Sequence, residues 1–347
     1  MEISTIGIDL AKESFQIHAA DERGKAVLKK KLKRKEMMPF FANLKPCLIG
    51  MEACSGSHYW ARKLESMGHL VKLMAPQFVK PYVKANKNDA ADAEAICEAV
   101  TRPSMRFVST KSVQQQSMLS LHRVRSLLVA ERTAMANQTR GLLSEFGIVI
   151  PQGIKTLRTR LPDILEDAEN ELPSEIRDLI TMLNERIQSI TENVDLLELK
   201  IRLSNKQNEQ IKRLEDIPGI GPLTASAFVA TIGSVDAFKN GRELAAFIGL
   251  VPRQQSTGGK PNLLGISKRG DSYLRMLLIH GARAVIRFAE SKQDKSPWLV
   301  GLIGRRNKNI AAVALANKNV RIIWAMLARD TPFNPAHVSV APMPANG

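Results

Sequence analysis

Four carboxylates in the first third of the chain have the types and spacing of a metal-ligand set. Asp9 lies in IGIDLAK, Glu52 in LIGMEACSG, and Asp89 and Asp92 in KNDAADAEA. The first two end strand-like runs, and the last two are three residues apart in a helix-forming stretch, so they project from one face. Clustered carboxylates repel unless hard divalent cations lie between them, and two such cations about 4 Å apart stabilise the entering and leaving oxygens at a phosphodiester. The set therefore predicts two-metal nuclease chemistry.

The elements that would position these carboxylates follow one another in a recognisable order. Three strands are predicted first, then a short helix, a fourth strand, a second helix and a fifth strand. The predicted strands are Ile3–Leu10, Phe15–Ala20, Lys25–Leu32, Cys47–Met51 and Leu70–Met74, and the second helix lies near Tyr59–Met67. Three hairpin strands followed by strand–helix alternation are typical of the ribonuclease H topology.

The charge of the chain indicates a polyanionic partner. The 347 residues carry 50 basic and 34 acidic side chains, a formal net charge of +16. Residues 161–216 hold 14 acidic and 7 basic residues, whereas residues 252–330 hold 15 basic and 4 acidic ones, so the positive charge concentrates towards the C-terminus. Three cysteines give no disulfide framework or metal spacing, and no apolar run or leader pattern indicates a membrane. We expect a soluble, intracellular protein.

The middle of the chain is predicted to be helical. Residues 112–146 form one long helix candidate, which Gly147 and Pro151 end. A second helix begins at Pro173, with Ser174 as its expected cap. Apolar residues recur in it at spacings of three and four, which predicts a coiled-coil pairing within or between chains. The seam residues are Ile176, Ile180, Leu183, Ile187, Ile190, Val194, Leu197 and Ile201.

The segment LEDIPGIGPLTASAFVATIG, residues 214–233, has a helix–hairpin–helix pattern. Gly219 and Gly221 would let the backbone approach a phosphate, and Thr224 and Ala225 would open the second helix, whose free N–H groups favour anions. A tight helical turn without a ligand is the other interpretation. The basic charge nearby favours contact with a nucleic-acid backbone.

A flexible polar loop, Ser256 to Gly259, lies within residues 249–284. Cations surround it: Arg253, Lys260, Lys268, Arg269 and Arg275. Its hydroxyl is either a phosphate ligand or a nucleophile towards phosphorus, because nearby cations stabilise a developing alkoxide and the pentacovalent phosphorus. Composition alone favours the phosphate-binding interpretation.

These motifs together resemble one family over nearly the whole chain. IGIDLAK, GMEACSG, KNDAADAEAI, IPGIGPLTA, LAAFIGLVPRQ, STGGK and LLGISKRGDSYLR stand in the order found in DEDD transposases of bacterial insertion sequences. Relatives of that family include the pilin-gene invertase and bridge-RNA-guided serine recombinases. The resemblance implies an RNase H-like (RuvC-like) domain at 1–108, a helical coiled-coil region at 109–210, a mostly helical transposase domain with helix–hairpin–helix at 211–335, and a tail at 336–347.

The resemblance also implies residue roles. Asp9, Glu52, Asp89 and Asp92 become the catalytic metal-binding tetrad for Mg²⁺ or Mn²⁺. A family serine that links covalently to DNA corresponds to Ser256 when the STGG loop is aligned, and to Thr257 when GLVPR is aligned without gaps. A primary hydroxyl is less crowded in attack on phosphorus, which favours Ser256.

The implied function is recombination of an insertion sequence. A dimer or tetramer binds double-stranded DNA and a structured non-coding guide RNA, which supplies sequence specificity through base pairing. Three other classes fit parts of the pattern. An actin-like ATPase would need a second glycine-rich phosphate loop, which the sequence lacks. A second alternative is a metal-dependent nuclease that forms no covalent intermediate. A third is a nucleic-acid-binding protein without catalysis, which explains the positive charge but gives the four carboxylates no function.

Overall fold

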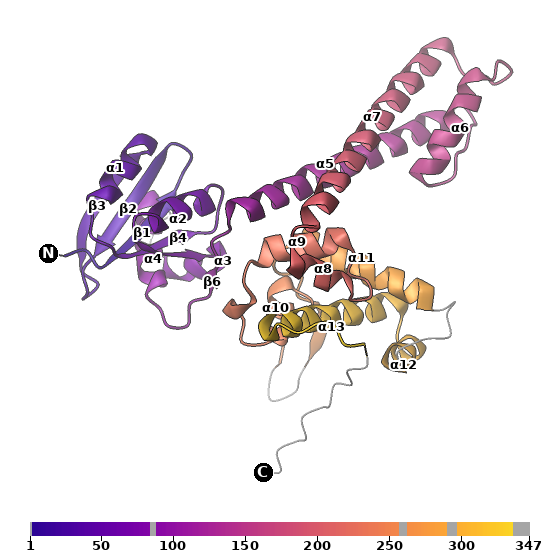
Figure 1. Cartoon of the computed structure of the whole chain (residues 1–347). Helices are drawn as coiled ribbons and strands as arrows, with labels where there is room; N and C mark the ends of the chain where they lie inside the picture. The colour runs from indigo at the N-terminus through magenta and orange to yellow at the C-terminus, as the bar shows by residue number, and fades with distance from the viewer. Residues whose placement is uncertain (1, 84–87, 257–261, 290–296, 336–347) are drawn as a thin grey trace. The chain divides into compact units, whose positions relative to one another are not determined.

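The chain folds into two compact units (Figure 1). The computed structural model describes residues 2–83, 88–256, 262–289 and 297–335. Unit 1 comprises Met1–Gln116 together with Ile232–Lys239, and unit 2 comprises Ser117–Thr231 and Asn240–Gly347. A short segment from the second half of the sequence therefore belongs to the unit built by the first third. The three-part division expected from the sequence stays a prediction.

Unit 1 is built on a six-stranded mixed sheet of order β3-β2-β1-β4-β5-β6. The strands are β1 Thr5–Leu10, β2 Ser14–Ala20, β3 Ala26–Lys33, β4 Leu48–Glu52, β5 Leu70–Met74 and β6 Phe107–Val108. β1, β2 and β3 form an antiparallel meander, β4 and β5 run parallel to β1, and β6 closes the edge in antiparallel fashion. The five predicted strands are confirmed, and this arrangement is consistent with an RNase H-like domain. The two-residue β6 was not predicted.

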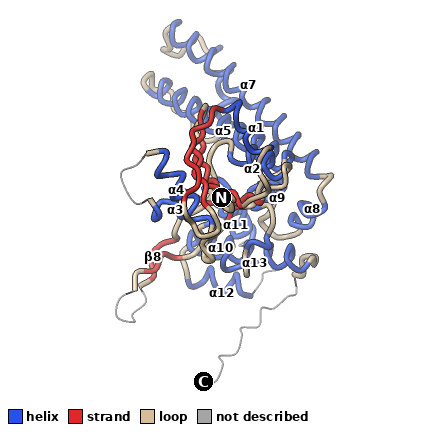
Figure 2. The backbone as a smooth tube through the Cα atoms, turned by 90° about the vertical axis from the view of Figure 1, so that its left-hand side faces the viewer, coloured by secondary structure: helices blue, strands red, loops and turns tan. Residues whose placement is uncertain are grey.

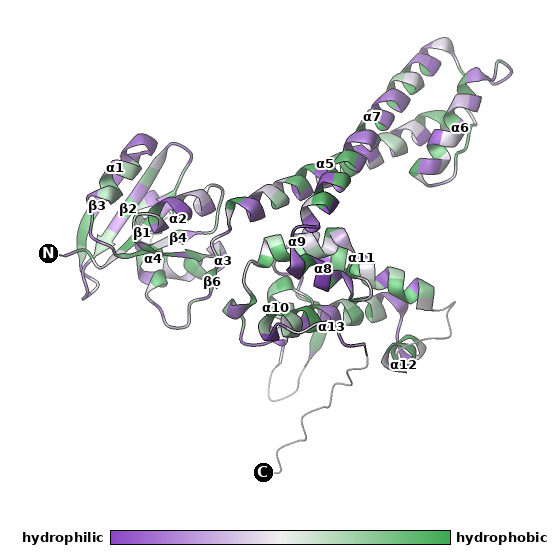
Figure 3. Cartoon of the chain, in the orientation of Figure 1, coloured by the Kyte–Doolittle hydropathy of each residue, from purple (hydrophilic) through white to green (hydrophobic). Residues whose placement is uncertain are grey.

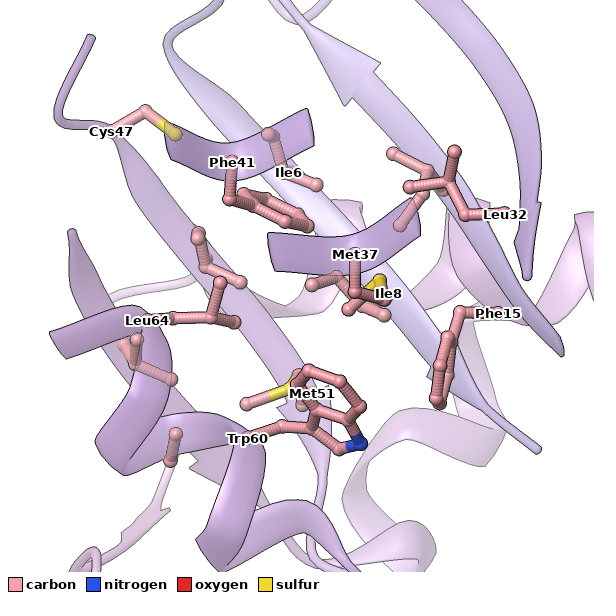
Figure 4. Packing of buried hydrophobic residues seen from close by; sticks show 14 of the residues in the cluster. Ile6, Ile8, Phe15, Leu32, Met37, Phe41, Cys47, Met51, Trp60 and Leu64 are labelled. Atoms are coloured by element: carbon pink, nitrogen blue, oxygen red, sulfur yellow. The ribbon is translucent and has the colours of Figure 1, made fainter. Parts of the chain in front are cut away.

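The two faces of this sheet are covered differently. On one face, alternate strand residues such as Ile8 and Phe15 pack against α1 (Met37–Ala42) and α2 (Ser57–Glu65) (Figure 4). Trp60 of α2 meets the Phe15 ring edge-on, with ring centroids 5.1 Å apart. The other face carries α4 (Asp89–Val100), which follows the short helices α3 (Pro76–Val79) and η2 (Lys80–Tyr82) in the chain; the 3-10 helix η1 (Arg34–Glu36) leads from β3 into α1. Side chains alternate between these faces because strand residues have a period of two.

Three helices of unit 2 explain the heptad pattern. α5 (Val113–Ser144), which begins in unit 1, is followed by α6 (Ile154–Glu166) and α7 (Ser174–Asn205). α5 and α7 are antiparallel, since Arg125 pairs with Glu198 and Arg186 with Glu131, and polar and apolar residues alternate along both (Figure 3). Five of the eight seam residues are buried within the single chain, Ile180, Ile187, Ile190, Val194 and Ile201, and the other three, Ile176, Leu183 and Leu197, are half-buried. The seam therefore contributes to packing within one chain, and a pairing between chains stays a prediction.

Both long helices lie close to their predicted limits. Gly147 has a φ of 75° and lies three residues after Ser144, the last residue of α5. The expectation that Ser174 caps α7 is wrong: Pro173 occupies the N-cap position, and Ser174 is the first helical residue, with its hydroxyl 3.2 Å from Glu175 Oε2. Proline before a helix supplies the extended conformation of the cap, but it has no side-chain oxygen to bind the free N–H groups.

The rest of unit 2 is mostly helical, as predicted, with one short β-hairpin (Figure 2). Its elements are α8 Glu209–Glu215, α9 Pro222–Ile232, α10 Gly241–Ile248, β7 Pro252–Gln254, β8 Leu263–Ile266, α11 Ser272–Ala289, α12 Pro297–Arg305 and α13 Lys308–Arg329; the 3-10 turn η3 Val235–Ala237 belongs to unit 1. α13 packs against α10 and α11. Among the described helices, α13 alone is long and apolar enough to cross a membrane, and less than half of its most apolar window is buried.

Candidate metal centre and nucleic-acid surface

Asp9 and Glu52 end adjacent parallel strands on the same face of the sheet. β1 and β4 pair through Gly7 with Gly50 and through Ile8 with Met51, so the register places Asp9 level with Glu52. Both carboxylates are half-buried. Burial raises the pKa of the nearby Cys54 thiol, and the negative charges of Glu52 and Asp9 add to that rise. The two carboxylates thus create one shared region of negative potential at the strand ends, which is a setting that favours a cation.

The direction of α4 carries its acidic first turn towards these strand ends. Cys97 Sγ lies 3.8 Å from the carbonyl oxygen of Thr5, and one turn earlier a Cβ on Gly7 would overlap the carbonyl oxygen of Ala93. Moving back along α4 therefore means moving forward along β1, towards Asp9. Glycine is required at position 7 because no side chain fits between this strand and the helix.

Asp89 and Asp92 lie in the first turn of α4. Asn88 caps the helix by accepting a hydrogen bond from Ala91 N at 2.8 Å. Asp92 is half-buried and Asp89 is exposed. Acidic residues in a first turn also stabilise the helix through its dipole, so this position alone does not define a ligand.

The donor chemistry of the tetrad fits a hard divalent cation, but the described residues do not form a closed ligand set. Across residues 2–83, 88–256, 262–289 and 297–335, no group of three or more His, Cys, Asp and Glu side chains is close enough to hold a metal ion. The fold brings Asp9 and Glu52 to one edge and directs the first turn of α4 towards it. The four-carboxylate site therefore stays a prediction.

The predicted helix–hairpin–helix segment forms a turn between α8 and α9 that is held inside unit 2. Gly219 has a φ of 88°, and a Cβ there would lie 2.9 Å from the carbonyl oxygen of Gly281 in α11. The buried amides of Asn205 and Asn319 donate to Pro222 O and Pro218 O at 3.0 and 2.9 Å. Glycine at position 219 is thus explained by backbone packing against α11.

The other two residues predicted to contact nucleic acid in this segment differ in exposure. Thr224 is 6% exposed inside α9, which begins at Pro222, two residues earlier than the sequence indicated. Gly221 is exposed, and no atom lies within 4 Å of a Cβ built there. If this segment binds a nucleic acid, as predicted, the exposed backbone at Gly221 is more accessible to a phosphate than the buried Thr224.

Ser256 lies on the strand-connecting segment of the β7–β8 hairpin. It is exposed, and its Oγ accepts a hydrogen bond from Gln254 Nε2 at 2.7 Å. Thr257 and Lys260, named with it as candidates, lie outside the described residues. The preceding Arg253 is exposed. The hairpin thus presents a hydroxyl and a guanidinium group to solvent on one short element.

The three cations that follow the hairpin have different environments. Lys268 and Arg269 are exposed, whereas Arg275 is half-buried and donates from Nη1 to Ile248 O and Arg269 O at 3.0 and 2.9 Å. These bonds tie the C-terminal end of α10 to the turn before α11. The guanidinium of Arg275 therefore has a structural function in addition to the predicted contact with nucleic acid.

A buried polar network around His122 was missed in the sequence. His122 Nδ1 lies 3.0 Å from the Tyr273 hydroxyl and Nε2 lies 3.0 Å from Ser226 Oγ. Because Ser226 Oγ donates to Pro222 O at 2.7 Å, it can accept from Nε2–H, which leaves Nδ1 to accept from Tyr273. Burial, and then the charge of Arg125, lower the pKa of His122 to about 4. The neutral imidazole thus joins α5, α9 and α11.

The six-stranded mixed sheet, with helices on both faces, is consistent with an RNase H-like domain. A family profile described as "Transposase" matches residues 6–148, and one described as "Transposase IS116/IS110/IS902 family" matches residues 211–296. The chain is 50% identical over 337 residues to a "Probable family 20 transposase" of Pseudomonas aeruginosa, covering 96% of this chain and 100% of that one.

Two further relatives extend the comparison. The "Transposase for insertion sequence element IS1111A" of Coxiella burnetii is 45% identical over 333 residues, covering 96% of this chain and 92% of that one. The "Pilin gene-inverting protein" of Moraxella bovis is 23% identical over 289 residues, covering 80% and 79%. The chain belongs to the IS116/IS110/IS902 family of transposases. It is a DNA transposase, and its DEDD domain indicates dependence on a divalent metal.

Proposed function

We propose that this transposase cuts and exchanges DNA strands through a covalent serine–DNA intermediate, with Asp9, Glu52, Asp89 and Asp92 holding Mg²⁺ or Mn²⁺. The observation that supports the metal assignment is the shared negative field of Asp9 and Glu52 at adjacent strand ends. A bound divalent cation would neutralise charge developing at the scissile phosphodiester. The carboxylates themselves position that cation, and the half-buried setting strengthens their hold on it.

Ser256 is the proposed nucleophile, with Thr257 as the alternative. Its Oγ forms a bond to phosphorus as the bond from phosphorus to one deoxyribose oxygen breaks, and that oxygen leaves with a proton. Attack by the hydroxyl of another strand reverses the step and releases Ser256. The phosphoester energy is conserved, so no ATP is required. The exposed position of Ser256 on a hairpin next to Arg253 supports this role, because a guanidinium stabilises charge on a phosphoryl group.

We also propose that a structured non-coding RNA guides the reaction by pairing with donor and target DNA, and that the active assembly is a dimer or tetramer in the bacterial cytoplasm. Resemblance to bridge-RNA-guided recombinases supports the guide. Most of the α7 seam is buried within one chain, which favours an oligomer that forms through other surfaces. The exposed residues Leu196, Leu199 and Leu203, on the outside of α7, offer one such surface.

The metal role is tested with Asp9→Asn, which keeps the shape of the side chain and removes its charge. Metal-dependent strand cleavage should be lost while DNA binding persists. Asp21→Asn is the matched control, because Asp21 accepts hydrogen bonds within an exposed turn of unit 1. Cleavage at the wild-type rate by Asp9→Asn would exclude the metal assignment.

The serine role is tested by trapping the protein on a nicked DNA substrate and denaturing it. The wild-type chain should retain DNA covalently, Ser256→Ala should not, and Thr257→Ala should retain part of the adduct. Mass spectrometry of the peptide from Arg253 to Lys260 locates the link. A nucleotide on Thr257 would transfer the role to that residue. Free DNA ends without any adduct would instead support plain metal-dependent hydrolysis.

A further inference from the structure

The densest run of cations in the chain lies on β3 of unit 1. Between positions 25 and 35, seven of the eleven residues are Lys or Arg and none is acidic: Lys25, Lys29, Lys30, Lys31, Lys33, Arg34 and Lys35. β3 forms one edge of the six-stranded sheet, so these side chains lie along an open strand.

The strand register places part of this run on the carboxylate face. Asp9 of β1 pairs with Gln16 of β2, and Gln16 pairs with Lys31 of β3, so these three residues lie level with one another across the sheet. Residues directly opposite one another share a face, and so do residues two apart on a strand. Lys29, Lys31 and Lys33, which we term the β3 lysine row, therefore project from the same face as Asp9.

α4 covers one end of this row and leaves the other open. Lys29 Nζ lies 3.4 Å from Glu94 Oε2, and His18 Nδ1, paired in register with Lys29, lies 3.9 Å from the same oxygen. Lys31 and Lys33 are further along β3 and are exposed. Within the part of the chain that the structure describes, no ion pair involves either of them. Two cations thus face solvent on the side of the carboxylates.

We infer that the β3 lysine row binds the sugar–phosphate backbone of the DNA strand whose phosphodiester lies at Asp9 and Glu52. This inference rests on the proposed function. Lys31 is two strands from Asp9, about 10 Å across the sheet, and successive members of the row are about 6.7 Å apart. That spacing is close to the separation of neighbouring phosphates along one strand. A polyanion would otherwise be repelled by the carboxylates, and the row attracts it to the correct edge.

Edge strands also carry lysine because charge prevents strand-to-strand aggregation. That explanation makes no distinction between the two faces of β3. Lys30 supplies the contrast, because it pairs in register with Ile17, projects from the opposite face, and lies 5.4 Å from the Phe40 ring centroid. Lys35 is in η1, which leads into α1 on that opposite face. The chain therefore offers a control pair of equal charge.

The experiment compares Lys31→Gln/Lys33→Gln with Lys30→Gln/Lys35→Gln in the full chain. DNA binding is measured against salt concentration with a short duplex of an element end, and again with a single-stranded RNA. The first pair should lower the salt slope for DNA by about 2 and weaken binding by up to about 60-fold at 0.1 M salt. The second pair should leave both unchanged. Lys31→Arg/Lys33→Arg keeps the charge and should restore binding.

The outcomes separate this inference from the proposed function. Binding is measured without cleavage, so loss of the metal assignment would not alter this result. An unchanged DNA slope in the first pair, an equal fall in both pairs, or a fall with RNA but not with DNA would each overturn the inference. If cleavage is also measured, the first pair should raise KM and leave kcat near wild type, since these lysines position the substrate and do not contact the reacting phosphorus.

Discussion

Replacing Gly7 with alanine should separate α4 from the strand that carries Asp9. A Cβ at position 7 would overlap the Ala93 carbonyl oxygen and lie 2.8 Å from Cys97 Cα. Carbon atoms pack favourably at about 3.5 to 4.0 Å, so the helix must move by about 1 Å. Overpacking of this kind costs about 1 to 3 kcal/mol. If the free energy of unfolding falls by about 2 kcal/mol, the melting temperature of a unit of this size should fall by about 10 °C.

The same movement should impair the reaction more than it impairs DNA binding. It displaces the first turn of α4, and a misplacement of about 1 Å can cost about 100-fold in rate. Thermal unfolding and cleavage of an element-end duplex measure the two effects. Gly141→Ala is the matched control, because no atom lies within 4 Å of a Cβ there and it is inside α5; it should stabilise the protein by about 0.5 to 1 kcal/mol. Wild-type stability and cleavage in Gly7→Ala would refute the close contact of β1 with α4.

Two further predictions concern unit 2. In the folded chain His122 is neutral at pH 7, because its pKa is lowered to about 4. In the unfolded chain the same imidazole takes up a proton near pH 6.5. The free energy of unfolding should therefore fall as the pH drops from about 6.5 to 4. His122→Gln should reduce that dependence in urea unfolding, and an unchanged difference between pH 7 and pH 5 would contradict the assignment. Ile187→Asp should cost about 3 to 5 kcal/mol, since Ile187 is fully buried within the chain. Met182→Asp, at a residue of α7 that is 57% exposed, should change stability by about 0.5 kcal/mol or less. An Ile187→Asp variant of native stability that only loses its partner subunit would show that the seam joins chains.

The strands and long helices were predictable because local patterns specify them. In β1 and β4, a run of apolar residues leads to a carboxylate. Gly147 lies shortly after the C-terminal end of α5, and Pro173 directly precedes the first residue of α7. The strands β7 and β8, which flank the predicted loop Ser256 to Gly259, were not predicted, because runs of three and four residues give too little periodicity. Strand β6 was not predicted because two residues are too few to show the alternation of apolar and polar side chains that marks a strand.

The sequence was sufficient to predict which residue types form the candidate site, but not the tertiary contacts that hold the surrounding elements in place. The strand ends reveal Asp9 and Glu52, yet the need for glycine at position 7 depends on α4, more than 80 residues later. The partners of His122 are also remote: Ser226 and Tyr273 are 104 and 151 positions away. Such contacts leave no local signal, because the residues that satisfy a buried imidazole are chosen by tertiary packing.

The membership of Ile232–Lys239 in unit 1 has a consequence for synthesis of the protein. All six strands of the sheet are synthesised more than 100 residues before this segment is made. At about 5 to 20 residues per second, the nascent sheet waits for on the order of ten seconds. During that time Ser109, whose Cβ would lie 3.4 Å from a Cβ on Gly233, has no covering segment. A fragment ended between the two units would keep this surface exposed, so the boundary suggested by the linear sequence is a poor place to divide the chain.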